Sequence, residues 1–280
     1  MNLQSALNEG REFLKNKNIK NSKLDSEILM SKIINKDRKF IILNNDYNLS
    51  YKSFVNFKEL VNQRSKGKPI AYLTGKKNFW KYDFEISQNV LIPRPDTELL
   101  IEQILEITKN KLKLNILDIG VGSGCILISV LKEKKDFRGT GIDISKKCLD
   151  LSRINACKFG VNNRIKFVKS DIDNFNYGKY DLIISNPPYI KKLDLFNLRK
   201  NSIRFEPIIA LNGGIDGTSI ISKVINKSSK LIKKNGKLVL EIAYDQKDKV
   251  KKKLNKKGFY INKILKDLGN NYRCIISTKL

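Results

Sequence analysis

LNILDIGVGSG, residues 114–124, joins a short apolar run to a glycine-rich turn. A continuous apolar run of this length is typical of a strand that is buried on both faces of a sheet. Glycines after such a strand let the backbone approach a ligand closely, and open α/β sheets bind ligands at the carboxyl ends of their strands. These residues therefore predict a buried strand, a ligand-binding turn and a helix that begins at Ser123.

Strand and helix signals keep alternating after this turn. Short apolar runs separated by amphipathic helices predict a parallel sheet that is covered by helices on both faces. The expected fold class is therefore α/β. Further strands are predicted at residues 140–143, 165–168, 182–185, 237–242, 259–263 and 273–278.

The first part of the chain has a different pattern. Residues 1 to about 67 have helical periodicity without strand-like alternation, and Leu3, Leu7 and Leu14, for example, fall on one helical face. Ser22 and Asp25 have capping-box-like spacing, which predicts the start of a second helix. This region is expected to form a small helical domain.

A hairpin and a linker are expected between the two regions. Residues 70–86 are rich in aromatic and β-branched side chains, which predicts a β-hairpin. A linker with two prolines follows at 91–95, and Asp96 is the expected N-cap of the next helix. We therefore expect a helical domain ending in the hairpin at residues 1–85, and a sheet domain at residues 86–280.

The composition restricts the chemistry. The 280 residues include no histidine, which excludes histidine metal ligands and histidine-activated nucleophiles. No apolar run approaches the roughly 20 residues that span a bilayer, and the N-terminus lacks the apolar core of a secretion signal. We therefore expect a cytoplasmic protein with no membrane partner. The four cysteines form no Cys-x-x-Cys pair, and we expect reduced core residues and no metal site at Cys125, Cys148, Cys157 and Cys274.

The net charge of +27 permits two interpretations. Such an excess is typical of proteins that contact nucleic acid or the ribosome. Here the excess is almost all lysine, is spread along the whole chain and accompanies abundant isoleucine and asparagine, which indicates a compositional bias. The sequence leaves both interpretations open.

The glycine turn does not match a dinucleotide site. That fingerprint is glycine-x-glycine-x-x-glycine, whereas here Cys125 takes the last position and Gly124 comes one residue early. Asp118, just before the glycines, suits a ligand with a positive ammonium group better than it suits a pyrophosphate. These features favour S-adenosylmethionine over NAD.

Two more carboxylates follow predicted strands. Asp143 ends the second strand, where a carboxylate can accept both ribose hydroxyls, and Asp171 follows the third, where it can accept from an adenine amino group. Taken alone, the turn could be a connection without a ligand, Asp143 a helix cap and Asp171 a loop residue. Their joint position at successive strand ends favours a cofactor site.

Asn186-Pro187-Pro188-Tyr189 follows the fourth predicted strand. An isolated Asn-Pro-Pro is a turn signal, but here it lies beside the expected cofactor site. The Asn186 oxygen and the Pro187 carbonyl can accept the two N–H groups of a planar nitrogen, and Tyr189 offers a face for stacking. The motif predicts methylation of a carboxamide or an exocyclic base amine. No strong general base is needed, because the nitrogen becomes acidic once it is methylated.

These motifs, with three further segments, resemble the release factor glutamine methyltransferases of the HemK/PrmC type. The further segments are Pro69–Gly75, the linker Leu91–Glu98, and Arg204–Pro207 followed by Ala210 and Leu211. The linker discriminates best, because the related ribosomal-protein glutamine methyltransferases depart from Arg-Pro-Asp-Thr-Glu there. The resemblance spans nearly the whole chain. It implies a class I, Rossmann-like methyltransferase domain with a small helical N-terminal domain that helps to grip the substrate.

The resemblance also implies a reaction. Such proteins methylate the side-chain amide nitrogen, N5, of the glutamine in the Gly-Gly-Gln motif of peptide chain release factors, with S-adenosylhomocysteine as the product and without a metal. The implied chain is a monomer that does not require nucleic acid, although its charge leaves a ribosomal or RNA contact open. The implied catalytic residues are Asn186, Pro187 and Tyr189, and the implied substrate-binding residues are Asn186, Pro187, Pro188 and Tyr189. The implied cofactor-binding residues are Asp118, Gly120, Val121, Gly122, Ser123, Gly124, Asp143, Asp171, Ile172 and Asn186.

Two departures and three alternatives accompany this resemblance. Ile172 stands where the family often has an aromatic residue, so weaker stacking on adenine is expected. The family pattern does not continue after Glu241, which leaves the role of Glu241 open.

A nucleic-acid adenine N6-methyltransferase is the first alternative function; it would suit the charge, but the sequence lacks an evident target-recognition domain. A ribosomal-protein glutamine methyltransferase is the second alternative. A non-catalytic binding module is the third, and the intact Asn186 argues against it.

Overall fold

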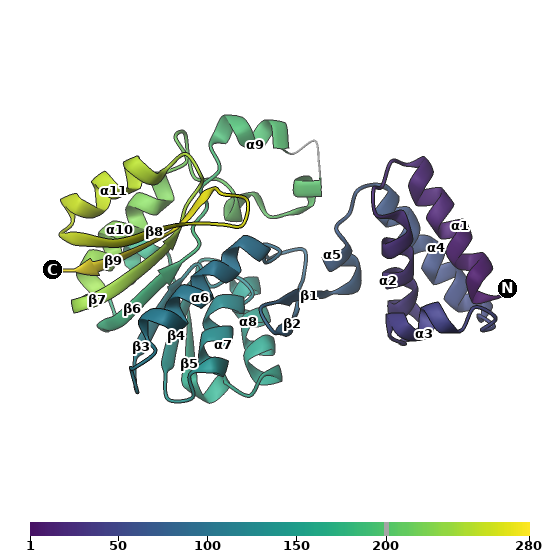
Figure 1. The fold of residues 1–280 in the computed structure, drawn as a ribbon, viewed down its shortest axis with the longest axis horizontal. Helices are drawn as coiled ribbons and strands as arrows, with labels where there is room; N and C mark the ends of the chain where they lie inside the picture. The colour runs from purple at the N-terminus through teal and green to yellow at the C-terminus, as the bar shows by residue number, and fades with distance from the viewer. Residues whose placement is uncertain (199–201) are drawn as a thin grey trace. The chain divides into compact units, whose positions relative to one another are not determined.

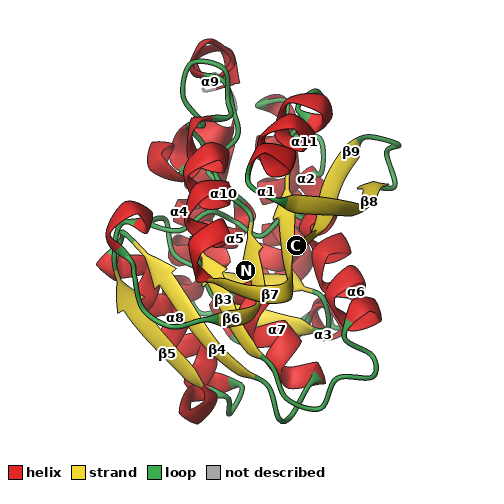
Figure 2. Cartoon of the chain, turned by 90° about the vertical axis from the view of Figure 1, so that its left-hand side faces the viewer, coloured by secondary structure: helices red, strands yellow, loops and turns green. Residues whose placement is uncertain are grey.

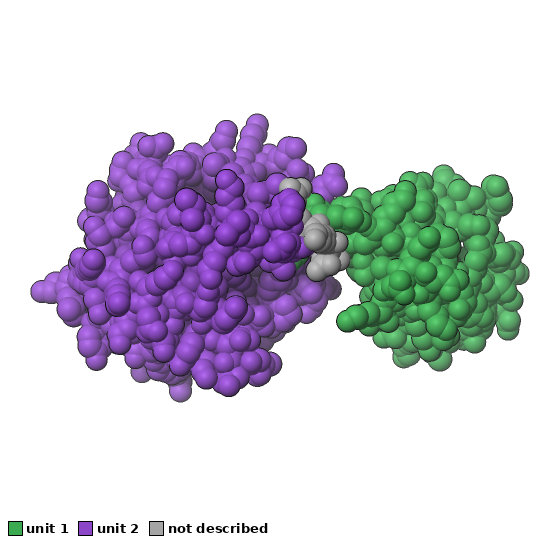
Figure 3. Space-filling view, turned by 90° about the horizontal axis from the view of Figure 1, so that it is seen from above, with its two compact units in different colours: residues 1–76, 201–205 green, residues 77–200, 206–280 purple. Residues whose placement is uncertain are grey.

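The computed structural model describes residues 1–198 and 202–280. The chain forms two compact units, residues 1–76 with 201–205 and residues 77–200 with 206–280 (Figure 3). The sequence led us to divide the chain after residue 85, whereas the contacts of the folded chain change at Lys77. The assignment of substrate binding to residues 1–85 and of catalysis to residues 86–280 stays a prediction.

Helices make up the first unit. Their apolar faces pack around Leu3, Leu29 and Phe57, which are buried. The expected capping box is wrong: helix α2 begins without a side-chain cap, and Asp25 instead accepts a hydrogen bond from Arg64 (2.7 Å). The helices are α1 (Leu3–Asn16), α2 (Ser22–Ile34), α3 (Arg38–Leu43), α4 (Tyr51–Ser65) and α5 (Ile70–Thr74).

The β-hairpin is shorter than the sequence predicts. Strands β1 (Lys76–Phe79) and β2 (Tyr82–Glu85) form it, but residues 70–74 form helix α5. Pro69 precedes this helix, and Gly75 ends it with a φ of +77°. A proline before a helix and a left-handed glycine after it are typical end signals, and here they outweigh the β-branched composition.

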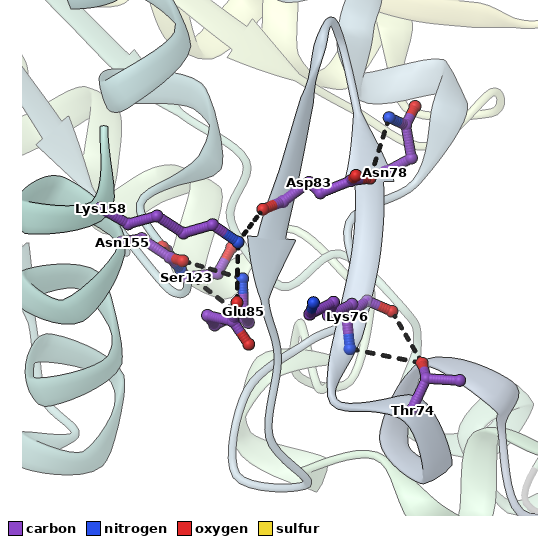
Figure 4. Close-up of polar contacts among 8 residues, drawn as sticks. All are labelled: Thr74, Lys76, Asn78, Asp83, Glu85, Ser123, Asn155 and Lys158. Atoms are coloured by element: carbon purple, nitrogen blue, oxygen red, sulfur yellow. Dashed lines mark hydrogen bonds and ion pairs between the residues drawn. The ribbon is translucent and has the colours of Figure 1, made fainter. Parts of the chain in front are cut away.

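Two side chains of helix α8 (Lys146–Lys158) attach the hairpin to the rest of the second unit (Figure 4). Asn155 is buried; its oxygen accepts from the Glu85 N–H (2.8 Å), and its nitrogen donates to the carbonyls of Glu85 (3.1 Å) and Ser123 (2.9 Å). Lys158 donates to the Asp83 carbonyl and to the Glu85 carboxylate, at 2.7 Å each. Asn155 thus connects the hairpin directly to the glycine turn.

The second unit contains a seven-stranded sheet in the order β5-β4-β3-β6-β7-β9-β8, which confirms the α/β class (Figure 1). Strand β9 runs antiparallel to both of its neighbours, and the other pairs are parallel. The expectation of a wholly parallel sheet is wrong at this edge, because the turn from β8 to β9 is too short for a crossover. The strands are β3 (Asn115–Ile119), β4 (Arg138–Asp143), β5 (Ile165–Lys169), β6 (Tyr180–Ser185), β7 (Ile232–Glu241), β8 (Phe259–Lys266) and β9 (Tyr272–Lys279).

Helices cover both faces of this sheet (Figure 2). Helices α6 (Glu98–Ile107), α7 (Cys125–Glu133) and α8 pack side by side on one face, and α10 (Ser219–Leu231) and α11 (Lys247–Lys256) pack on the other. Sheet residues such as Leu117, Ile183 and Leu238 are fully buried between these layers. The remaining elements are α9 (Lys192–Leu198) and the 3-10 turns Pro95–Thr97, Asn162–Arg164, Ile172–Asn174, Ser202–Phe205 and Ile208–Ala210.

The cysteines and the helices test two expectations from composition. Cys125, Cys148 and Cys274 are buried, whereas Cys157 is exposed on α8 and is not a core residue. Over the residues that the structure describes, no helix combines the length and apolar character needed to cross a membrane.

Candidate active site

The side on which successive strands are added to the sheet reverses between β3 and β6. Successive strands after β3 add on one side of it, whereas β6 and β7 add on the other. Open α/β sheets bind ligands at such a switch point, at the carboxyl ends of the strands. A cavity of about 310 Å³ lies here, lined by residues that follow β3, β4, β5 and β6. Its size suits a small-molecule ligand.

In the glycine turn, Gly120–Gly124, the first four residues form one wall of this cavity. The three glycines of the turn all have positive φ values, which cost other residues about 1–2 kcal/mol each. A Cβ atom on Gly120 would meet nothing within 4 Å, so the space beside it is open. A Cβ atom on Gly124 would lie 2.7 Å from Ile128 Cδ1, so this glycine allows the turn to pack closely on α7.

Asp143 ties the end of β4 to the glycine turn. Its Oδ2 accepts from the Gly122 N–H (3.0 Å) and its Oδ1 from the Ser145 N–H (2.9 Å), while Ser145 itself caps α8. Burial raises the pKa of Asp143, and these hydrogen bonds oppose the rise. The residue lines the cavity, and each carboxylate oxygen keeps a lone pair that can accept from a ligand hydroxyl.

Asp118 is buried behind the glycine turn. Neither of its oxygens has a hydrogen-bond partner in the described part of the chain, and burial, with the nearby charge of Asp143, raises its pKa to about 7. An unpartnered buried carboxylate is costly, and a cation close by would lower that cost. Within the described cavity wall, Ile119 and Gly120 take part and Asp118 does not, so any such cation would act across the turn.

The third carboxylate, Asp171, follows β5. It accepts from the Asp173 N–H (2.8 Å) and so caps the turn Ile172–Asn174. Asp171 and Ile172 both line the cavity, and Ile172 also packs against the core of the sheet. The fold therefore brings the ends of β3, β4 and β5 to one cavity, and the binding roles of these residues stay a prediction.

The Asn-Pro-Pro-Tyr motif, residues 186–189, extends from the end of β6. Asn186, Pro187 and Pro188 line the same cavity as the glycine turn. The side-chain nitrogen of Asn186 donates to the Thr97 hydroxyl (3.2 Å). Tyr189 does not belong to the described wall, and its hydroxyl donates to Glu241 Oε1 (3.1 Å). Burial and the charge of Glu241 raise the pKa of Tyr189, so its hydroxyl keeps its proton.

Glu241, whose role the sequence leaves open, lies behind this motif at the end of β7. It is almost completely buried, which raises its pKa to about 7. The nearby Thr97 hydroxyl, the hydrogen bond from Tyr189 and the charge of Arg273 oppose that rise, while Oε2 has no hydrogen-bond partner among the described residues. Glu241 thus lies beside Tyr189, the last residue of the motif, and beside Thr97, which binds the first residue, Asn186.

Remote residues hold the backbone of the motif. Gln246 donates from Nε2 to the carbonyls of Tyr189 and Gly217, at 3.0 Å each. A Cβ atom on Gly213 would lie 2.8 Å from Tyr189 Cα, and one on Gly217 would lie 2.5 Å from the Tyr189 oxygen. Sequence reasoning missed this brace: the glycine-rich stretch 213–217 could have indicated a close approach of the backbone, but not that Gln246 takes part in it.

An ion pair with a buried carboxylate fixes the proline linker. Glu206 accepts from Arg94 at Oε1 (2.6 Å) and from the Ile92 N–H at Oε2 (3.2 Å), and its side chain is 3% exposed. The resemblance singled out both segments without giving them a joint role. Asp96 is not the expected N-cap: it lies in a 3-10 turn, 3.7 Å from the Arg273 guanidinium, and Thr97 precedes α6.

The chemistry of this site fits S-adenosylmethionine. This molecule combines a ribose with two hydroxyls, an adenine and a positively charged amino-acid end. The site combines open space beside Gly120, a cavity-lining carboxylate at Asp143 and an unpartnered buried carboxylate at Asp118. Each feature of the site therefore has a counterpart in the ligand.

Comparisons with known proteins cover both units. The family model "PrmC N-terminal domain" matches residues 5–75, and "methyltransferase small domain" matches residues 95–204. A release factor glutamine methyltransferase from Clostridium acetobutylicum is 34% identical over 100% of this chain and 99% of that protein. A bifunctional methyltransferase from Rickettsia bellii is 34% identical over 98% of this chain, which spans about half (54%) of that longer protein.

A solved structure supports the fold. A methyltransferase from Pyrococcus furiosus covers 78% of this chain and 98% of its own, with a TM-score of 0.53 and 18% sequence identity. At that identity the likeness concerns the fold alone.

Proposed function

The chain belongs to the release factor glutamine methyltransferase family, and we propose that it methylates the side-chain amide nitrogen (N5) of a glutamine in peptide chain release factors. S-adenosylmethionine is the methyl donor. The observation that carries this proposal is that Asn186, Pro187 and Pro188 of the motif line one cavity with the glycine turn. Relatives that span the whole chain are named for this reaction, and the family resemblance assigns the glutamine to a Gly-Gly-Gln motif.

The residues of the motif position the glutamine amide. Bound S-adenosylmethionine supplies an electrophilic methyl group. The Asn186 oxygen and the Pro187 carbonyl accept the two N–H groups of the amide. These bonds hold the nitrogen in position for in-line attack on the methyl group. The same acceptors stabilise the positive charge that develops on this nitrogen. Tyr189, held through its hydroxyl by Glu241, offers its ring to the planar amide.

The other walls of the cavity hold the cofactor in this proposal. Asp143 accepts the ribose hydroxyls, Asp171 and Ile172 flank the adenine, and Asp118 favours the ammonium group from behind the turn. The backbone of Gly120, Val121, Gly122 and Ser123 approaches the cofactor closely, and Gly124 keeps that backbone in place.

The domains and the setting complete the proposal. Residues 1–85 help to bind the release factor, and residues 86–280 carry out the transfer, in a monomer that works in the cytoplasm. Nucleic acid is not required. The adenine N6-methyltransferase alternative has the +27 charge in its favour, but the full-length relatives from Clostridium and Leptospira are named for release factors.

The decisive experiment is incubation of the chain with a bacterial release factor and methyl-labelled S-adenosylmethionine, followed by mass spectrometry of release-factor peptides. One methyl group is expected on the glutamine of the Gly-Gly-Gln peptide. A release factor in which alanine replaces that glutamine serves as the control and should stay unlabelled. Label on adenine in added DNA, with none on the release factor, would overturn the proposal in favour of the alternative.

A further inference from the structure

Thr97 is a buried threonine whose hydroxyl does not perform the task usual at its position. It ends the 3-10 turn Pro95–Thr97 and immediately precedes α6, a position at which a threonine oxygen can accept from a free backbone N–H of the helix, although the backbone of Thr97 is itself already helical (φ −68°, ψ −20°). No such bond forms here. The oxygen instead accepts from the side-chain nitrogen of Asn186, at 3.2 Å. The hydroxyl therefore faces the active site rather than its own helix.

Glu241 determines the direction of this hydrogen bond. An ionised carboxylate can only accept. Glu241 Oε1 accepts from the Tyr189 hydroxyl (3.1 Å), whereas its buried Oε2 has no hydrogen-bond partner among the described residues, and the Thr97 hydroxyl lies close enough to lower the pKa of Glu241. A threonine hydroxyl has a single proton. When Thr97 donates that proton to the unpartnered Oε2 of Glu241, its oxygen can only accept from its other neighbour, Asn186. The donors are thus ordered from Asn186 to Thr97 to Glu241.

This order sets the orientation of the Asn186 amide. The two ends of a carboxamide differ, since the nitrogen donates and the oxygen accepts. With its nitrogen held by Thr97, Asn186 turns its oxygen away from Thr97, and among the described residues that oxygen accepts no hydrogen bond. In the opposite orientation, the Asn186 N–H groups would face the N–H groups of a substrate amide.

We propose that Thr97, ordered by Glu241, is a positioning residue that keeps the Asn186 oxygen directed at the substrate amide. The inference rests on the proposed function, because it takes a nitrogen with two N–H groups as the acceptor of the methyl group. Glu241 also holds Tyr189, so one buried carboxylate acts on both ends of the Asn-Pro-Pro-Tyr motif.

The test compares Thr97→Val, which removes the hydroxyl at nearly constant shape, with Thr97→Ser, which keeps it. Thr97→Val should lower kcat for release-factor methylation by about 10- to 100-fold, the usual effect of losing a group that orients an active-site residue. KM for the release factor and Kd for S-adenosylhomocysteine should change by less than about threefold, because these ligands keep their own contacts. Thr97→Ser should recover kcat to within about threefold of wild type.

Thr108→Val is the matched control. Thr108 is also a buried threonine, next to the other end of α6, and its hydroxyl donates to the Ile104 carbonyl, away from the cavity. This variant should retain wild-type kcat even if its melting temperature falls. Equal kcat for Thr97→Val and wild type would overturn the inference, as would a Thr97→Ser variant as slow as Thr97→Val. Absence of methylation by the wild-type chain would instead count against the proposed function.

Discussion

The two walls of the cavity are held in place in different ways. The glycine turn is a local structure, in which three glycines within five residues follow one strand and Asp143 of the adjacent strand binds its backbone. The Asn-Pro-Pro-Tyr motif is held from a distance, by Thr97 in the linker, Glu241 at the end of β7 and Gln246 beyond it. The cofactor side thus depends on a short segment, whereas the acceptor side depends on most of the second unit.

The buried carboxylates behind the two walls differ in the same way. Asp118 and Glu241 are both almost completely buried, and burial raises the pKa of each to about 7. Asp118 has no hydrogen-bond partner among the described residues, whereas Glu241 accepts from Tyr189. The environment of Asp118 therefore becomes favourable when a ligand supplies a cation, whereas the protein itself already supplies Tyr189 as a partner for one oxygen of Glu241.

The largest effect should come from the acceptor wall. Asn186→Ala removes one of the two acceptors for the substrate amide, and we expect kcat to fall by about 10²–10³-fold, as for other lost transition-state contacts. Calorimetric affinity for S-adenosylhomocysteine should stay close to wild type, because the glycine turn does not depend on Asn186. An equal loss of turnover and affinity would show that Asn186 belongs mainly to the cofactor wall.

A smaller effect should come from the cofactor wall. Gly120→Ala places a methyl group in the open space beside the turn, and crowding of a bound ligand there should weaken S-adenosylhomocysteine binding by about 10- to 100-fold. Gly160→Ala is the matched control, because Gly160 also has a positive φ (+66°) and open space around it but does not line the cavity. Both variants should lose about 1–2 kcal/mol of stability from backbone strain.

Calorimetry and thermal unfolding separate the two effects of these glycine variants. Weaker binding in Gly120→Ala alone, with similar melting temperatures for both, would support a direct ligand contact at the turn. If Gly160→Ala weakened binding as much, strain rather than contact would explain the change, and the local character of the cofactor wall would have to be reconsidered.

The same contrast decides what the sequence could predict. The strands and the glycine turn follow from local apolar runs and glycine spacing, and Asn186 follows from a four-residue motif. Gln246 could not be predicted as a brace, because its partners Tyr189 and Gly217 become its neighbours only after the sheet has formed. The direction of β9 was also missed, since apolar periodicity does not distinguish parallel from antiparallel pairing at the edge of a sheet.

Charged side chains account for the remaining errors at helix ends. Asp25 and Asp96 both have the residue type and spacing of capping residues, and in both cases an arginine that is distant in sequence competes for the carboxylate. Arg64 binds Asp25 at 2.7 Å, and Arg273 lies 3.7 Å from Asp96. Only the folded chain reveals that Arg64 holds Asp25 in a nearly buried ion pair and that the 3-10 turn Pro95–Thr97 separates Asp96 from the start of α6.

The smallest effect, and the sharpest test of the two carboxylates, concerns pH. A raised pKa of about 7 means that Glu241 is protonated below this pH and ionised above it. Only the ionised form forces Thr97 to donate to it, so kcat should rise with pH and should be about tenfold lower at pH 6 than at its plateau. The chain contains no histidine that would titrate in this range. The titratable groups that act on Glu241 are Tyr189, Arg273, Asp96, Cys125 and Cys274.

Measuring kcat at saturating cofactor separates the effect of Glu241 protonation from that of Asp118 protonation. Protonation of Asp118 should weaken the binding of a ligand that carries an ammonium group, which affects Kd and not kcat. We therefore expect Glu241→Gln to have a lower kcat that no longer changes between about pH 6 and 8, and Asp118→Asn to keep the wild-type kcat profile while its cofactor Kd loses its pH dependence. If Glu241→Gln kept the wild-type profile, the titrating group would lie elsewhere, and the acceptor wall would not depend on a charged Glu241.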